Sequence, residues 1–301
     1  MKASTITTSL ITSTAAIALL LTGCGKSGGD GAKKAETLTI QNIGSDTMVN
    51  LAQEWAEAYA KVEPSVSVEV SGGGSGVGVA ALLNGTCDIA NSSRKLEAEE
   101  EEKATAKYNG QHPKEWHVGY DALAIYVHPS NPMTEISVEE LGNIFREGGT
   151  VVKWSDLGAT LPSGDAEIIR VSRQNNSGTY HYFREAVVGK KADFKAGSRD
   201  MNGSKDVVDL ISSTPTAIGY SGIGYKTDKV KVLKVSKKKG DASVEPTIAT
   251  TLDKTYPIAR PMFMYTPPGV GAHVVKYLEW TLGPKGQEIV EHSGYIPLVK
   301  K

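Results

Sequence analysis

Apolar residues switch between two spacings along most of the chain, and the alternation predicts an α/β protein. Short runs with the two-residue period of a strand are followed by runs in which every third or fourth residue is apolar, as on one helix face. The expected strands are Leu38–Ile40, Val66–Val70, Asp88–Ala90, Tyr120–His128, Ile168–Val171, Ala217–Tyr220 and Met262–Tyr265. Helices are expected around Leu51–Tyr59, Val79–Leu83, Glu97–Lys107, Val138–Phe145, Tyr180–Val188 and Ala272–Leu282.

The order of these elements predicts how they pack. Strand, helix and strand alternate over the first third, which favours a parallel sheet flanked by helices. Tyr120–His128 is almost continuously apolar, so this strand should be buried on both faces. Lys231–Lys239 alternates lysine with valine and leucine, which predicts an exposed edge strand protected by its charges.

The first residues are expected to lie outside the fold. Residues 1–23 carry a lysine at position 2 and continue into a short apolar run, as in a secretory signal peptide. Leu21-Thr22-Gly23-Cys24 resembles a bacterial lipobox, so we expect lipidation at Cys24 and export to the outer face of a membrane. Residues 24–36 have the composition of a flexible tether. An uncleaved anchor is the alternative, although the apolar run is short for a membrane span.

Composition narrows the possible functions. The chain has 301 residues, enough for two medium domains, and a net charge of −1, which argues against a nucleic-acid-binding protein. It has two cysteines. If Cys24 carries lipid, Cys87 has no partner for an intrachain disulfide and should be a small core residue.

Three loops share one design, in which glycine and hydroxyl residues lead into a helix. They are Gly44-Ser45-Asp46-Thr47, Gly74-Ser75-Gly76 and Arg173-Gln174-Asn175-Asn176-Ser177-Gly178-Thr179. A helix start offers free N–H donors, glycine permits close backbone approach, and hydroxyls add donors that rotate to fit. One such loop is equally well a helix cap. Three in one chain indicate a shared tetrahedral oxyanion.

Two charged residues refine this hypothesis. Arg173 can grip two oxygens of one anion, with a surface ion pair as the alternative. Asp46 would repel an anion unless a proton lies between them. Monohydrogen phosphate carries such a proton and sulfate does not, so an acceptor at Asp46 would select phosphate. A plain helix cap is the other interpretation of Asp46.

Two other classes of protein, a hydrolase and a dinucleotide-binding protein, have weaker support in the sequence. The six histidines show no metal-ligand spacing, the Gly-x-Ser-x-Gly match at Gly25–Gly29 lies in the tether, and His181 is expected on a helix surface. These observations argue against a hydrolase. Gly76-Val77-Gly78-Val79-Ala80-Ala81 resembles a dinucleotide-binding turn, but the pattern is weak alone, and the other two loops favour a small free oxyanion.

From about Leu38 to Pro297 the chain resembles the periplasmic phosphate-binding proteins that feed phosphate ABC transporters. The segments that carry the resemblance are Gly44–Met48, Gly74–Gly76, Asp88–Arg94, Arg173–Thr179, Ala217–Tyr225 and Tyr256–Pro261. The resemblance implies that phosphate is held by Ser45, Asp46, Thr47, Ser75, Gly76, Ser93, Arg173, Ser177, Gly178 and Thr179. Some members carry an aspartate that accepts the phosphate proton where this chain has Ser93. We therefore assign that role to Asp46 as a hypothesis, and leave Arg94 either as a second cation for the ligand or as a partner of Asp46 or Asp88.

The resemblance also implies an architecture and a setting. The fold would be the two-domain periplasmic-binding-protein fold of type II, with two crossovers near Tyr120 and Arg260 as a hinge and the ligand in the interdomain cleft. Residues 37–120 and 256–301 would form the first domain, and residues 121–255 the second. The implied protein is a monomer without catalytic residues, metal or cofactor, and its partner is a membrane permease. A binder of another oxyanion, such as sulfate or molybdate, and a phosphate-ester hydrolase remain the alternatives.

Overall fold

The computed structural model describes residues 37–298, and these residues form one compact unit. The signal peptide, Cys24 and the tether lie outside the described residues, so these assignments stay predictions. Within residues 37–298, no helix combines the length and the apolar content needed to cross a membrane.

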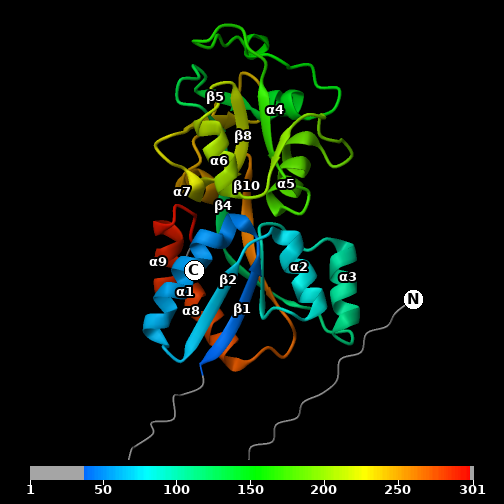
Figure 1. Cartoon of the computed structure of the whole chain (residues 1–301), viewed down its shortest axis with the longest axis vertical. Coiled ribbons are helices and arrows are strands. Elements are labelled where there is room, and N and C mark those ends of the chain that lie inside the picture. Colours follow the sequence, from blue (N-terminus) through cyan, green and yellow to red (C-terminus); the bar gives the residue numbers. More distant parts are fainter. Residues whose placement is uncertain (1–36, 299–301) are drawn as a thin grey trace, which may run out of the picture. The chain divides into compact units, whose positions relative to one another are not determined.

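The first lobe is built on a five-stranded mixed sheet (Figure 1). Its parallel strands are β1 (Leu38–Gly44), β2 (Val66–Ser71) and β3 (Ile89–Ser92), with β1 in the middle. β10 (Ala259–Thr266) pairs antiparallel with β3 on one side and with β4 (Lys114–Val127) on the other. The parallel arrangement expected for the first three strands is therefore confirmed.

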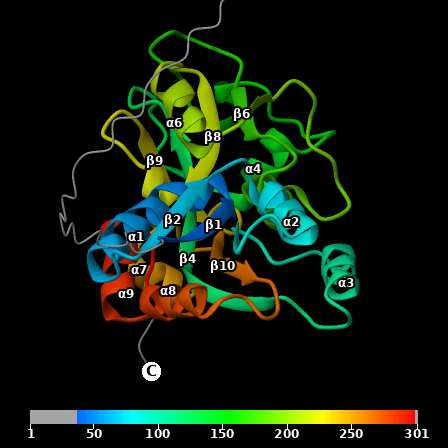
Figure 2. The same cartoon turned by 60° about the horizontal axis from the view of Figure 1, so that its bottom comes forward.

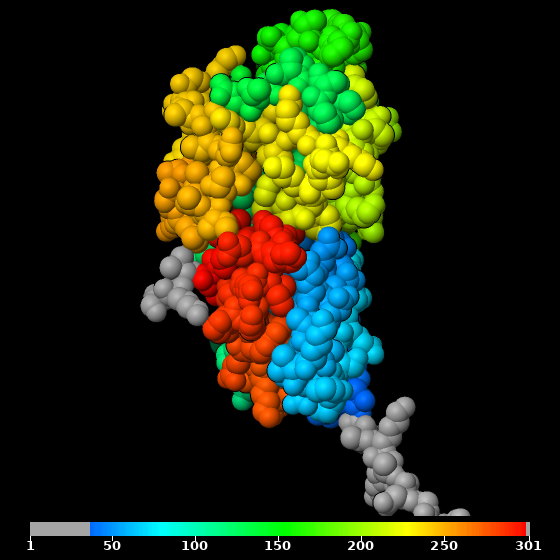
Figure 3. All heavy atoms as spheres, turned by 90° about the vertical axis from the view of Figure 1, so that its left-hand side faces the viewer, coloured from blue at the N-terminus to red at the C-terminus, as the bar shows by residue number. Residues whose placement is uncertain are grey.

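Helices cover both faces of this sheet (Figure 2). One face packs on α1 (Val49–Val62), α8 (Ala272–Leu282) and α9 (Pro284–His292), and the other on α2 (Ser75–Asn84). α3 (Ala98–Lys107) lies outside α2 and carries the expected charged face. Buried Trp55 donates from its indole nitrogen to the carbonyl of Gly286, 2.8 Å away. This bond joins α1 to α9, and α1 lies beside α8 and α9 on one surface (Figure 3).

β4 continues from the first lobe into the second. Its residues Lys114–Ala122 pair with β10, and Leu123–Val127 pair with β8 (Ala217–Gly222). The stretch Ala122–Val127 is completely buried, as its continuous apolar sequence predicts. The chain returns beside it, because the N–H of Leu123 donates to the carbonyl of Ile258 just before β10. The two crossovers thus lie where the resemblance implies them, whereas the limits at residues 120, 121, 255 and 256 stay a prediction.

The second lobe repeats the layered design. β6 (Ile169–Arg173) lies between β7 (Arg199–Met201) and β8, parallel to both. α4 (Val138–Phe145) and α5 (Gly178–Phe183) pack on one face around a stack of Phe183 on Tyr220, whose ring centroids are 3.7 Å apart. α6 (Ser204–Ser212) covers the other face. The remaining elements are β5 (Glu135–Ser137), β9 (Lys231–Ser236) and α7 (Ile248–Leu252).

Some elements differ from the sequence expectation. β9 is not an exposed edge strand, because it pairs with β4 through Lys231–Leu233 and with β5 through Lys234–Ser236. Its apolar positions fill the core while Lys234 points to solvent, so the lysine alternation marks one exposed face and not an open edge. The helix expected at Tyr180–Val188 starts at Gly178 and ends in a π-helical turn, Arg184–Val188. Cys87 is buried, as expected.

Candidate functional site

Loops from both lobes meet at the ends of parallel strands, where ligands bind in open α/β sheets. β2 of the first lobe leads into Gly72–Gly76, and β6 of the second lobe leads into Gln174–Ser177. The N–H of Gly76 donates to the carbonyl of Asn176 at 2.9 Å, and the amide of Asn176 donates to the carbonyl of Gly73 at 3.0 Å. Gly74 has φ +99°, and a Cβ there would lie 2.7 Å from the Asn176 oxygen, so this close approach requires glycine.

A second contact brings three predicted ligands together. The Ser75 hydroxyl accepts from the N–H of Ser93 at 3.1 Å, and the two hydroxyl oxygens lie 3.3 Å apart. Gly178 of the second lobe faces them, since a Cβ at Gly178 would lie 2.3 Å from the Ser75 oxygen. A side chain at position 178 would therefore push these hydroxyls out of place.

The Thr47 loop makes the third contact between the lobes. Thr47 follows β1, and its hydroxyl oxygen lies 2.8 Å from that of Thr179 at the start of α5. The Ser177 hydroxyl accepts from the N–H of Thr179 at 3.1 Å, and the N–H of Ser45 donates to the carbonyl of Asn91. Ser45, Ser75 and Ser177 are at most 2% exposed. The predicted loops thus converge inside the molecule and do not lie on separate surfaces.

Arg173 is an internal charge and not part of a surface ion pair. Its side chain is 1% exposed, and all three guanidinium nitrogens have partners. Nη2 donates to the Asp46 carboxylate at 3.0 Å and to the carbonyl of Asn202, while Nη1 donates to the Ser204 hydroxyl. Burial lowers the pKa of Arg173, and the neighbouring Asp46 opposes that shift.

Asp46 does not cap the helix that follows it. Its Oδ1 accepts from the N–H of Gly73 at 3.1 Å, and its Oδ2 accepts from Arg173. The helical turn Asp46–Met48 has Ser45, and not Asp46, at the N-cap position, and the Ser45 side chain makes no capping hydrogen bond. The capping interpretation is therefore wrong, and the carboxylate instead links the second glycine loop to Arg173. Whether Asp46 also accepts a phosphate proton stays a prediction.

Arg94 has neither of the partners proposed from the sequence. Its guanidinium binds both oxygens of Glu100 at 2.7 Å, with Glu97 4.0 Å away. Arg94 thus stabilises the entry to α3 and does not pair with Asp46 or Asp88.

Sequence reasoning missed a buried ion pair at the crossovers. Arg260 in β10 and Asp121 in β4 stand opposite each other in the antiparallel register, with exposures of 1% and 0%. Nε and Nη2 of Arg260 donate to one Asp121 oxygen at 3.0 and 2.8 Å. Nη2 also donates to the hydroxyls of Thr179 at 3.0 Å and Thr47 at 3.3 Å. The signal in the sequence was a charged residue in each strand of the predicted crossovers.

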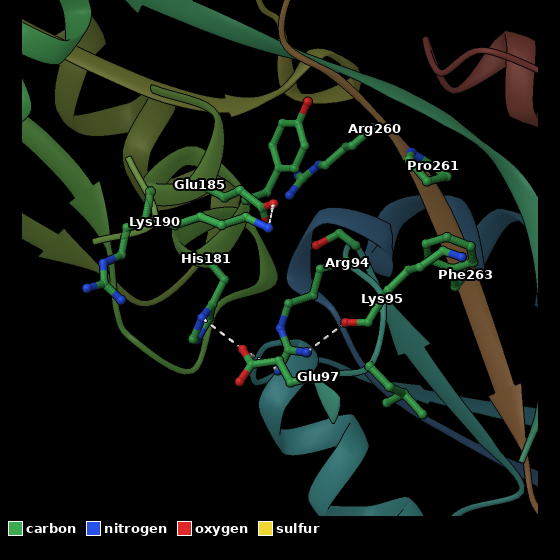
Figure 4. Close-up of a pocket in the computed structure, with 13 residues that line it drawn as sticks. Arg94, Lys95, Glu97, His181, Glu185, Lys190, Arg260, Pro261 and Phe263 are labelled. Carbon is green, nitrogen blue, oxygen red and sulfur yellow. Dashed lines mark hydrogen bonds and ion pairs between the residues drawn. The ribbon is translucent and has the colours of Figure 1, made fainter. Parts of the chain in front are cut away.

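A cavity of about 670 Å³ opens beside the hydroxyl cluster (Figure 4). Ser93 and Arg260 belong to its wall, as do Arg94, His181 and Lys190. Figure 4 shows Arg260 on β10 and His181 facing Glu97 across the cavity, 3.2 Å from nitrogen to oxygen. The cavity therefore reaches the predicted ligand residues from one side.

The geometry does not favour the two rival classes. Nε2 of His181 pairs with the carbonyl of Asn175 and Nδ1 faces Glu97, so neither ring nitrogen is placed as a base for the Ser177 hydroxyl. The N–H of Gly76 donates to the carbonyl of Asn176 in the other lobe, so the Gly76 turn is part of a contact between two loops and does not stand alone as a dinucleotide turn would.

Two α/β lobes joined by crossing strands, with polar loops facing each other between them, define a two-lobed solute-binding protein. The PBP superfamily domain matches residues 30–285 of the chain. This match covers both lobes up to the start of α9.

Individual relatives narrow the class. The phosphate-binding protein PstS of Pseudomonas aeruginosa is 36% identical over 272 residues, which cover 87% of this chain and 84% of that protein. Protein SphX of Synechococcus elongatus is 32% identical, over 89% of this chain and 80% of its own length. A phosphate-bound crystal structure of a putative phosphate ABC transporter substrate-binding protein from Clostridium perfringens has a TM-score of 0.77 at 27% identity, covering 87% of this chain and 100% of that chain. This chain belongs to the family of the phosphate-binding proteins PstS.

Proposed function

We propose that this protein binds inorganic phosphate and delivers it to the permease of an ABC transporter for import. The observation that carries the proposal is the meeting of three loops, rich in hydroxyl and amide donors, beside the buried Arg173. Such a set of donors fits the four oxygens of a tetrahedral anion. The names of the relatives at 36% and 32% identity and the phosphate-bound neighbour support the same ligand class.

The proposed ligand set is the one that the sequence predicts. The hydroxyls come from Ser45, Thr47, Ser75, Ser93, Ser177 and Thr179, backbone N–H groups come from Gly76 and Gly178, and the charge comes from Arg173. Many of these groups bond one another in the structure, so phosphate would replace bonds such as Thr47–Thr179 with bonds to its own oxygens. A small separation of the lobes would free the donors, and closure would strip water from the anion.

Asp46 supplies selectivity in this proposal. Its carboxylate holds Arg173 and accepts the proton of monohydrogen phosphate, which sulfate lacks at neutral pH. Sulfate would leave one of its oxygens facing the Asp46 carboxylate with no hydrogen between them, which would cost roughly 1–3 kcal/mol of binding free energy.

The setting follows from the amino terminus. The protein is exported, its signal peptide is removed, and lipid on Cys24 holds it as a monomer on the outer face of a membrane. It is a carrier and not an enzyme. Loading the purified protein with a phosphate ester should release no phosphate.

One titration tests the ligand. The chain from Glu36 onward, stripped of bound anion, is titrated calorimetrically with phosphate, sulfate and molybdate. We expect phosphate to bind at least tenfold tighter than sulfate, a difference of about 1.4 kcal/mol. Tighter sulfate or molybdate binding would assign the site to another oxyanion, and heat from none of the three would contradict the proposed function.

A further inference from the structure

One guanidinium edge at the crossovers is left open toward the cavity. Arg260 is 1% exposed, and its Nη2 reaches the hydroxyls of Thr47 and Thr179, both predicted ligands. Its Nη1 is buried and has no hydrogen-bond partner within residues 37–298. Arg260 also lines the cavity together with Ser93 (Figure 4).

A buried donor without a partner is costly. Buried polar groups are almost always hydrogen-bonded, and a buried donor without a partner costs about 1–3 kcal/mol, more when it is charged. Other cations of the cavity wall have carboxylate partners: Arg94 with Glu100, Arg184 with Asp193 and Lys190 with Glu185. Arg260 differs from Arg94 in which nitrogen is free among the described residues: Glu100 binds both terminal nitrogens of Arg94 and leaves Nε without a partner, whereas Asp121 binds Nε and Nη2 of Arg260 and leaves the terminal Nη1 available.

Asp121 fixes the direction of that open edge. One Asp121 oxygen accepts from Nε and Nη2 of Arg260, and the other accepts from the N–H of Ile223 at 3.0 Å. The ring of Tyr182 lies 5.4 Å from the guanidinium carbon, close enough for a cation–π contact. The guanidinium is therefore held by Asp121 on one edge and by the Tyr182 ring on one face, and its Nη2 points to the hydroxyls of Thr47 and Thr179.

We propose that Arg260 is a second phosphate-binding guanidinium, which grips the anion through its Nη1–Nη2 edge while Asp121 holds it in position. The inference rests on the proposed function, and it adds a residue to the site that the loop motifs do not contain. A planar fork suits two oxygens of one phosphate. Because Asp121 sits on the opposite edge, the guanidinium needs no rearrangement when the ligand arrives.

Two fixed guanidiniums predict a preference for the doubly charged form of phosphate. Each added negative charge on the anion strengthens its attraction to Arg173 and Arg260 in a site shielded from water. Removing Arg260 should therefore weaken binding more on the alkaline side of neutrality, where the dianion prevails, than on the acidic side.

The test separates ligand contact from structural support. Calorimetry with inorganic phosphate compares the wild-type mature chain with Arg260→Gln and with the double variant Arg260→Gln, Asp121→Asn, on both sides of neutral pH. The double variant removes both charges and keeps an amide pair, so no carboxylate is left buried alone. The matched control, Lys153→Gln with Asp165→Asn, removes a remote exposed pair.

We expect both variants to lose at least tenfold in affinity and the double variant to unfold cooperatively. Arg260→Gln, which removes the positive charge alone, should lose more affinity at alkaline than at acidic pH. The control pair should bind as the wild type does. Recovery of wild-type affinity in the double variant, or an equal loss at both pH values in Arg260→Gln, would mean that Arg260 only supports the fold. If the double variant fails to fold, Arg260→Lys decides, because it keeps the charge but not the fork: undiminished affinity would overturn the inference. Absence of phosphate binding by the wild type would instead overturn the proposed function.

Discussion

Arg173 and Arg260 are equally buried, but their carboxylate partners come from different parts of the fold. Arg173 ends β6 of the second lobe and meets Asp46, which follows β1 of the first lobe. Arg260 meets Asp121 across two paired strands that run between the lobes. The first pair exists only while the two loops are together, whereas the second is fixed by the register of the sheet.

This difference shows how one site combines movement with precision. A pair between lobes can open with them, and the Arg173 guanidinium keeps Ser204 and two backbone carbonyls as partners when Asp46 moves away. A pair within one sheet stays in place. In the proposed site, Arg260 would therefore meet the anion at a position that does not depend on closure.

The largest effect should follow from breaking the fixed pair. Asp121→Ala leaves the Arg260 charge buried without a carboxylate, and we expect the free energy of unfolding to fall by about 3–5 kcal/mol. Asp46→Ala should cost less, about 1–2 kcal/mol, because Arg173 retains its other partners. Urea denaturation of both variants measures the two losses, and equal losses would remove the distinction between the pairs.

Removing the charge between the lobes should act on binding. We expect Arg173→Ala to weaken phosphate binding by at least tenfold, about 1.4 kcal/mol, because a charged donor next to the anion is lost. Calorimetry measures the change. The control is Arg170→Ala, which removes another arginine of the same strand, whose Nη2 donates to the carbonyl of Ala196. An unchanged affinity would exclude Arg173 from the site.

A milder substitution tests the role of the carboxylate that pairs with Arg173 between the lobes. Asp46→Asn keeps a group of the same size beside Arg173 but offers an N–H where the carboxylate accepts. We expect the ratio of phosphate to sulfate affinity to fall severalfold, by about 1 kcal/mol. The exposed Asp165→Asn should leave the ratio alone. If Asp46→Asn preserves the ratio as well, another group must accept the phosphate proton.

Arg94 can be compared with Arg173 and Arg260, because its carboxylate partner Glu100 is near it in the sequence and partly exposed. Burial would raise the pKa of Glu100, but the bonds from Arg94 and from the Glu97 N–H outweigh burial and leave that pKa lowered. A carboxyl with a lowered folded-state pKa stabilises the fold above its ordinary pKa, and this stabilisation disappears as the pH falls through the folded-state value.

Glu100→Gln should therefore lower the free energy of unfolding at neutral pH by about 1 kcal/mol, with no difference from the wild type in strong acid. Urea denaturation across the acidic range measures this, and Glu102→Gln on the same helix is the control. A difference that persists after Glu100 is protonated would point to lost packing and not to lost charge.

Much of the fold could be predicted from local patterns. Alternation and helical spacing located most strands and helices because each element must bury one apolar face, whatever its neighbours are. α6 and the final helix α9 were not predicted. The edge assigned to Lys231–Lys239 was wrong, since a half-buried strand shows the same alternation whether or not its backbone is paired.

The candidate site also has a part that local patterns predicted and a part that they did not. Glycine and hydroxyl residues before a helix are a local signal, so the three loops were visible in the sequence. The partners of Asp46 and Arg94 were not, because a carboxylate or a guanidinium reaches whatever group the fold brings near, and several candidates were equal in sequence terms. Only the structure connects Arg94 to Glu100 and Asp46 to both Gly73 and Arg173.

By itself the sequence determined the α/β class, the strand buried on both faces and the donor-rich loops, because these depend on neighbouring residues in the chain, whereas the two crossovers were expected from the resemblance. The tertiary structure decided which charges meet. Asp121 and Arg260 are 139 positions apart and become partners only through the register of β4 and β10. Pairing across such a distance follows from packing the whole sheet, which no local pattern encodes.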